Sequence, residues 1–145
     1  MKFAGKEVRI GFYNAISGLI TYNAVGVSVY DLKAPKGTAK PYVILQSYTQ
    51  NGNAGTKQSF AANVTLGIKI VNGFEEDEWT REPNDYVSNA ILELVRPTTE
   101  GNGLTVTGFD VLKVNLQGSF DSTLQTDTEL LVTTDLVFEL EINEQ

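Results

Sequence analysis

The sequence predicts an α+β fold: a mixed, mostly antiparallel sheet of about five strands with two helices packed on one face. Two segments repeat apolar residues at spacings of three and four, as amphipathic helices do, and two long segments alternate apolar with polar residues, as half-buried strands do. In chain order the predicted elements are a helix, three strands, a helix and two strands. The chain has 145 residues, a common single-domain size, so we expect one domain over 1–145.

The first segment is predicted to be a helix that ends near residue 20. Its apolar stripe consists of Val8, Phe12, Ala15, Ile16, Leu19 and Ile20. Gly11 and Gly18 lie within the segment, and each weakens a helix by about 1 kcal/mol relative to alanine. Packing of the stripe must therefore offset two weak positions. Residues 21–25 are the expected exit from the helix.

Two strands and a long loop come next. Residues 27–30 alternate apolar with more polar side chains and predict a short strand, and a strand rich in β-formers follows over 41–50. Residues 49–59 are polar and contain the Asn51–Gly52 pair, which favours the backbone conformation of a hairpin turn. Because this stretch is too long for a tight turn, we predict a protruding, mobile hairpin loop over 49–59.

The clearest predicted strand covers residues 60–70, where apolar residues fall on every even position. After a charged connection, Pro83 marks the start of a second helix, because its missing N–H is not needed in the first helical turn. This helix should stop before Pro97, which biases the preceding residue away from helical backbone. Its apolar stripe consists of Tyr86, Val87, Ala90, Ile91, Leu94 and Val95.

The last third of the chain is predicted to be extended. We expect a strand over 104–116 with a break near Gly108, a polar connection over 118–128 and a final strand over 130–142. In the final strand the apolar stripe falls on even positions and the carboxylates fall on odd positions, so the strand has two different faces. Long strands at the edges of a sheet are association sites, and symmetric self-assembly commonly covers them.

The composition excludes several classes of function. The chain has no cysteine and no histidine, so it has no thiolate nucleophile, no disulfide, no imidazole base and no thiolate or imidazole metal ligand. A net charge of −7 opposes the gripping of phosphates, although it also favours solubility. There is no apolar run long enough to span a membrane, and Lys6, Glu7 and Arg9 interrupt the stretch that a signal peptide would need. We therefore expect a protein made in a cytoplasm, with no membrane partner.

Two groups of acidic residues resemble metal sites. Residues 75–78 form an acidic run, but they lack the spacing of a calcium loop and are better explained as a solvated charged loop. The second group comprises Asp121, Asp127, Asp135, Glu139 and Glu141, of which the last three share one strand face. Nuclease sites generally add a basic residue, and none follows Lys113. We expect no catalytic residue, no metal and no cofactor; a metal-dependent carboxylate enzyme and a non-catalytic protein-binding adaptor remain alternatives.

Three segments follow one another along the chain: VSVYDLKAP at 27–35, PYVIL at 41–45 and LVFELEI at 136–142, with the polar loop, the alternating strand and the second helix between them. In these segments and in the order of its elements, the chain resembles the tail-terminator, or tail-completion, proteins of long-tailed bacteriophages and related neck components. The chain departs from the family at Gln46 and Ser47, where a glycine is usual, and its stretch over 98–128 is longer. These departures leave room for a related protein, such as a neck ring of a short-tailed phage.

The resemblance implies a homo-oligomeric ring of six or twelve copies in the neck or tail of a virion, assembled in the host cytoplasm. Such a ring joins the portal or connector to tail proteins, and DNA passes through its lumen without specific binding. It catalyses no reaction. The side chains expected to contact a neighbouring ring or tube belong to the 49–59 loop and are Gln50, Asn51, Asn53 and Lys57.

Overall fold

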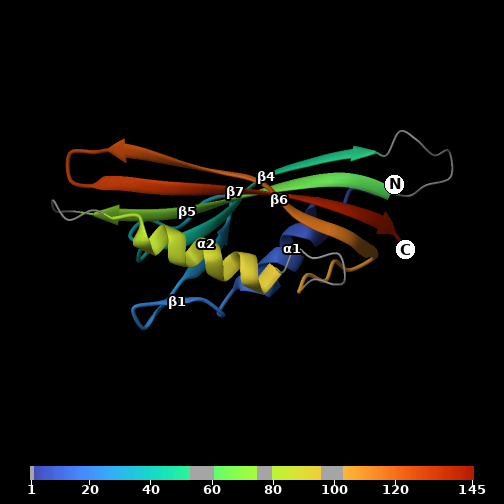
Figure 1. Ribbon diagram of the computed structural model, residues 1–145, viewed down its shortest axis with the longest axis horizontal. Coiled ribbons are helices and arrows are strands. Elements are labelled where there is room, and N and C mark those ends of the chain that lie inside the picture. Colours follow the sequence, from blue (N-terminus) through green and yellow to red (C-terminus); the bar gives the residue numbers. More distant parts are fainter. Residues whose placement is uncertain (1, 53–60, 75–79, 96–102) are drawn as a thin grey trace.

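The computed structural model describes residues 2–52, 61–74, 80–95 and 103–145. This part of the chain contains two α-helices and seven strands (Figure 1). The helices are α1 (Gly5–Ile16) and α2 (Glu82–Val95). The strands are β1 (Thr21–Tyr22), β2 (Val25–Gly26), β3 (Ser28–Asp31), β4 (Tyr42–Gly52), β5 (Ala61–Phe74), β6 (Phe109–Gln125) and β7 (Leu130–Glu144).

Five strands form the main sheet in the order β3-β4-β5-β7-β6, and β1 and β2 form a separate two-stranded sheet. β3 runs parallel to β4, whereas the β4–β5, β5–β7 and β7–β6 pairs are antiparallel. The predicted α+β class with a mixed, mostly antiparallel sheet is therefore confirmed. β3 and β6 are the two edges of this sheet, and β7 is inserted between β5 and β6.

Both helices lie on the same face of the main sheet (Figure 1). α1 packs on β3 and β4, and α2 packs on β5 and β7. Each helix turns most of its predicted apolar stripe inward, so that Phe12 of α1 and Ile91 of α2 are fully buried, whereas Tyr86, predicted in the stripe of α2, is 51% exposed. The described elements leave the opposite face of the sheet without a helix. Neither of the two described helices is long and apolar enough to cross a membrane.

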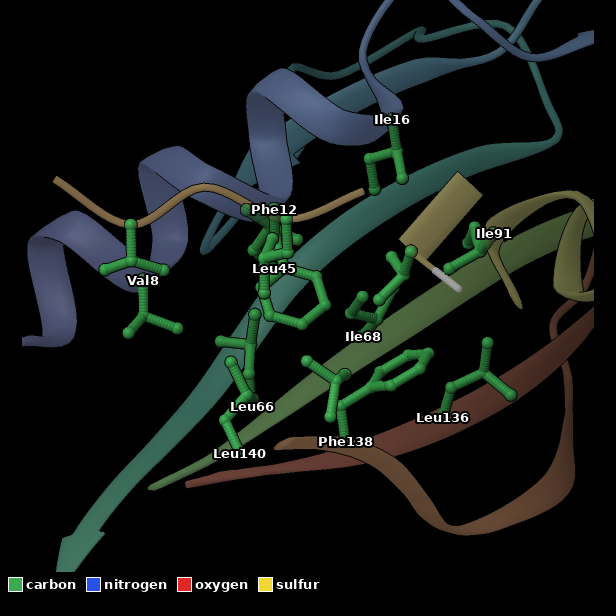
Figure 2. Packing of buried hydrophobic residues seen from close by; sticks show 14 of the residues in the cluster. Val8, Phe12, Ile16, Leu45, Leu66, Ile68, Ile91, Leu136, Phe138 and Leu140 are labelled. Atoms are coloured by element: carbon green, nitrogen blue, oxygen red, sulfur yellow. The ribbon is translucent and has the colours of Figure 1, made fainter. Parts of the chain in front are cut away.

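The hydrophobic core lies between the helices and the sheet (Figure 2). The alternating strands β5 and β7 direct their even-numbered apolar side chains toward the helices, and Leu66 and Phe138 are completely buried there. The ring centroid of Phe138 lies 5.5 Å from that of Phe12, within the range of favourable aromatic pairs. The alternation predicted for 60–70 and 130–142 thus sets which side of each strand meets the core.

The first helix ends earlier than the sequence predicts. Ser17 already has extended backbone at the C-cap, and Gly18 adopts a φ of +75°, a combination that ends a helix. Leu19, predicted to belong to the buried stripe, is 61% exposed. Residues 21–26 then form the β1–β2 hairpin instead of a simple exit. The prediction failed because the apolar spacing continues past a glycine at which the backbone leaves the helix.

The predicted polar connection over 118–128 is wrong for most of its length. β6 continues to Gln125, which pairs with Leu130 of β7. From Leu116 onward every residue of β6 is exposed. A strand exposed on both faces shows no apolar–polar alternation, so periodicity does not reveal it. The predicted break near Gly108 is confirmed, because this glycine has a φ of +84° and a bridge joins its flanking residues Val106 and Phe109.

An ion pair links the β3–β4 connection to the β6–β7 connection across β5. Nζ of Lys40, between β3 and β4, donates to both carboxylate oxygens of Glu129, between β6 and β7, at 2.9 and 2.8 Å. The pair passes over Gly73, where an added Cβ would lie 2.7 Å from Oε2 of Glu129. Glycine at this position therefore permits the close approach of the ion pair to the strand.

Candidate assembly surfaces

Gln50, a predicted interface residue, uses its side-chain amide within the chain. Its Oε1 accepts hydrogen bonds from the backbone N–H of Ala4 at 2.9 Å and from the Tyr48 hydroxyl at 2.7 Å. Its Nε2 donates to the backbone carbonyl of Lys2 at 3.0 Å. Gln50 thus holds the segment before α1 against the end of β4, and a contact with a neighbouring chain would compete with these bonds.

The other predicted interface residues are placed only in part. Asn51 lies on β4 opposite Asn63 of β5, and its side chain is exposed. Asn53 and Lys57 lie outside the described residues. β4 and β5 pair in antiparallel fashion as far as Gly52, so Gln50 and Asn51 belong to the strand rather than to the predicted loop. The role of all four residues in an interface stays a prediction.

The Tyr48 hydroxyl is expected to ionise well above its ordinary range. Burial disfavours the phenolate and raises the pKa of Tyr48 from 10.0 to about 12, while the nearby Arg9 guanidinium opposes this rise. Since the folded pKa exceeds the unfolded one, the contribution of Tyr48 to stability is complete below pH 10.0 and is lost as the pH rises to about 12.

Phenolate absorbance during an alkaline titration measures this effect, together with the pH dependence of urea unfolding. Tyr48→Phe should remove an ionisation step near pH 12 and reduce the loss of stability over the same interval. If the substitution instead removes a step near pH 10.0, the environment of Tyr48 is not as described.

The face of the sheet opposite the helices, called the outer face below, carries three of the predicted carboxylates. These are Asp135, Glu139 and Glu141, which fall on alternate positions of β7 as the sequence predicts. Asp135 lies opposite Lys69 of β5; burial raises the pKa of Asp135, and Lys69 lowers it in part. Among the described residues there is no group of three or more acidic side chains placed to hold a metal ion.

Asp121 and Asp127 do not join these carboxylates. Asp121 lies on the helix side of β6, where its Oδ1 accepts a hydrogen bond from the Thr134 hydroxyl at 2.7 Å. Nδ2 of Asn84, in the first turn of α2, donates to the same hydroxyl and to the carbonyl of Val132, both at 3.2 Å. This network anchors the start of α2 to β7. Asp127 lies in the connection between β6 and β7, so the structure separates the carboxylates that the sequence grouped.

The edge formed by β6 is a candidate assembly surface, and the element predictions missed its second half, after residue 116. β6 has 17 residues and pairs only with β7 in the described chain, which leaves one row of its backbone groups unpaired. Between 36% and 60% of each exposed apolar side chain on this strand is accessible, and these side chains are Leu112, Leu116, Phe120 and Leu124. Leu116 lies opposite Phe138 on the helix side and Phe120 lies opposite Asp135 on the outer face, so these side chains do not form one stripe that the sequence could reveal.

The second half of β6 has little of the usual protection of an edge strand, since Asp121 on its helix side is its only charged residue. Register shifts interrupt the first half, between Val111 and Lys113 and between Leu116 and Gly118. The run Gly118–Gln125 pairs regularly with β7 and contains no lysine, arginine or proline. Such a long, regular and partly apolar edge is typical of a strand that another chain covers.

Comparison with known proteins identifies the fold but no family. No protein-family model matches the chain, and no curated protein matches it. Among solved structures, the chain is similar to a chain of a structure described as "Virion of native gene transfer agent (GTA) particle", with 14% sequence identity and a TM-score of 0.75. The match covers 99% of this chain and 99% of that chain. The two chains therefore share one fold over almost their whole length.

Proposed function

We propose that this chain is a structural protein of a phage-like virion and forms a ring at the head–tail junction, as a tail terminator or as a neck or connector ring. The observation that carries the proposal is the fold shared, over 99% of both chains, with a component of a gene transfer agent virion. In this role the ring joins the portal or connector to the tail. The chain acts as a single domain, and DNA passes through the lumen.

Charge and surface chemistry support this role. The net charge of −7 suits a lumen, because acidic side chains repel DNA phosphates and let the duplex slide without being held. The unpaired edge of β6 offers a surface that another protein chain can complete. Neither feature requires a bound substrate.

The β4–β5 hairpin is the proposed contact with the next ring or tube along the particle. The hairpin places Gln50 and Asn51 at the far end of β4, in the strand that leads into residues 53–60. We assign the contact to Gln50, Asn51, Asn53 and Lys57.

The purified chain should form a closed ring of six or twelve copies, alone or when portal and tail proteins are added. Light scattering gives the mass, and negative-stain imaging gives the symmetry and shows whether a central channel is present. A particle-producing strain that lacks this chain should accumulate filled heads and tails that are not joined, and supplying the chain should restore joined particles.

Two results would contradict the proposal. One is a chain that stays monomeric with portal and tail proteins and instead captures a single peptide, which would favour the adaptor alternative. The other is a strain without the chain that still yields joined, infectious particles. A matched strain carrying Glu93→Lys, which reverses one exposed charge on α2, serves as the control for expression.

A further inference from the structure

The described side-chain charges divide the sheet into a basic half and an acidic half. Residues 2–52, which form α1 and the β3–β4 half, contain six lysines and arginines against two acidic residues, a net charge of +4. Residues 103–145, which form β6 and β7, contain one lysine against eight acidic residues, a net charge of −7. β3 and β6 are opposite edges of one sheet, so the two halves of opposite net charge lie at opposite ends of the strand order. On the edge strands themselves, β3 carries only Asp31, and β6 carries Asp110 and Asp121 against Lys113.

The acidic edge combines charge with apolar surface. Phe120 and Leu124 lie opposite Asp135 and Leu131 of β7, so their side chains project from the outer face. Phe120 is 59% exposed and Leu124 is 60% exposed. Large apolar side chains beside an unpaired strand edge are the usual anchors of a protein interface.

The basic edge has matching features. β3 has only four residues, and Leu32, directly after it, is 71% exposed with a φ of +65°. The left-handed backbone of Leu32 belongs to a tight turn in which the N–H of Lys33 donates to the carbonyl of Asp31 at 2.7 Å, and this turn presents the Leu32 side chain at the edge. Lys33 and Lys36 follow it and are exposed, and Arg9 of α1 lies 3.8 Å from Asp31 at the end of the strand.

We infer that neighbouring copies of this chain meet head to tail, with the β6 edge of one copy against the β3 edge of the next. Phe120 and Leu124 of the first copy then face Leu32 of the second, and the acidic half meets Lys33 and Lys36. Contact between two β6 edges would instead oppose two acidic halves, which repel each other. Repetition of one head-to-tail contact gives a ring when the rotation closes. This inference rests on the proposed ring function and assigns its subunit interface.

Two variants each block one edge and leave the other intact. Phe120→Thr with Leu124→Thr removes the apolar anchors of β6 but keeps residues that favour strands. Lys33→Glu with Lys36→Glu reverses the charge of the two lysines beside β3 and brings the net charge of residues 2–52 from +4 to 0. Each variant alone should associate at least about tenfold more weakly than the wild type, because it lacks one side of every contact. An equimolar mixture should give a dimer of twice the 15.9 kDa chain mass and nothing larger, since one intact edge of each kind remains.

Circular dichroism and thermal unfolding show whether the variants fold, and Phe120→Thr alone is the alternative if the double change does not. Glu93→Lys on α2 is the matched charge-reversing control and should assemble like the wild type. If the wild type forms rings and both blocked variants also form them, the edge assignment is wrong while the ring function stands. If the variant with the reversed basic edge dimerises by itself, β6 edges meet each other and the inference is overturned. A wild type that forms no ring with portal and tail proteins present overturns both.

Discussion

Replacement of Phe138 by alanine is expected to lower the free energy of unfolding by about 3–5 kcal/mol. Phe138 lies on the inner strand β7 and is completely buried between the sheet and α1, with its ring centroid 5.5 Å from that of Phe12 (Figure 2). Truncation removes both the transfer free energy of the ring and the aromatic contact, and it leaves a cavity between two elements that cannot close together freely. Urea unfolding followed by circular dichroism measures the change.

Phe120→Ala is the matched control, because it removes the same side chain from an exposed position on the neighbouring strand. Its free energy of unfolding should change by no more than about 0.5 kcal/mol in the monomer. Equal losses for the two variants would show that Phe138 is not in the core that the structure describes. Phe120→Ala should instead weaken association between copies.

Gly11→Ala is expected to destabilise the chain by about 1–2 kcal/mol, although alanine favours helices over glycine by about 1 kcal/mol. The reason is the backbone of the segment before β6, which crosses α1 at this point. An added Cβ on Gly11 would lie 2.6 Å from the carbonyl oxygen of Thr105, and a backbone atom yields less readily than a side chain. Steric overlap therefore outweighs the gain in helix propensity. Thermal and urea unfolding show whether the variant is less or more stable than the wild type.

Asn14→Ala measures the gain in helix propensity without the steric overlap at Thr105, because Asn14 is an exposed residue of the same helix. This variant should be more stable by a few tenths of a kcal/mol. A stabilised Gly11→Ala protein would mean that Thr105 does not approach the helix. The sequence alone predicts the opposite sign for Gly11, because only the fold brings Thr105 to this helix.

The parts of the fold that bury one face could be predicted from the sequence. β5 and β7 alternate because one side of each meets the core, and Pro83 lies in the first turn of α2, where its missing N–H is not needed. The second half of β6 lacks this signal, because both of its faces are exposed. Its identity as a strand comes from pairing with β7, an interaction that local sequence does not encode.

The candidate surfaces likewise divide into features that local sequence predicts and features that depend on the folded chain. The carboxylates of one strand could be placed on one face, since side chains alternate along β7. Gln50 could not be assigned its partners, because Ala4 and Lys2 reach it only after the chain has folded back over more than 40 residues. The opposite net charge of the two halves of the sheet likewise depends on strand order, which places the acidic C-terminal strands farthest from β3.

The insertion of β7 between β5 and β6 also constrains the order in which the strands can join the sheet during folding. Translation delivers β6 before β7, yet within the described chain β6 is joined to the sheet only through β7. The partners in the β5–β7 ladder range from Phe74 with Leu130, 56 positions apart, to Ala61 with Asn143, 82 positions apart. Contacts of such sequence separation form slowly. Within the described chain, β6 therefore joins the sheet only once β7 has paired with β5, so the exposed β6 edge is among the last parts of the fold to form.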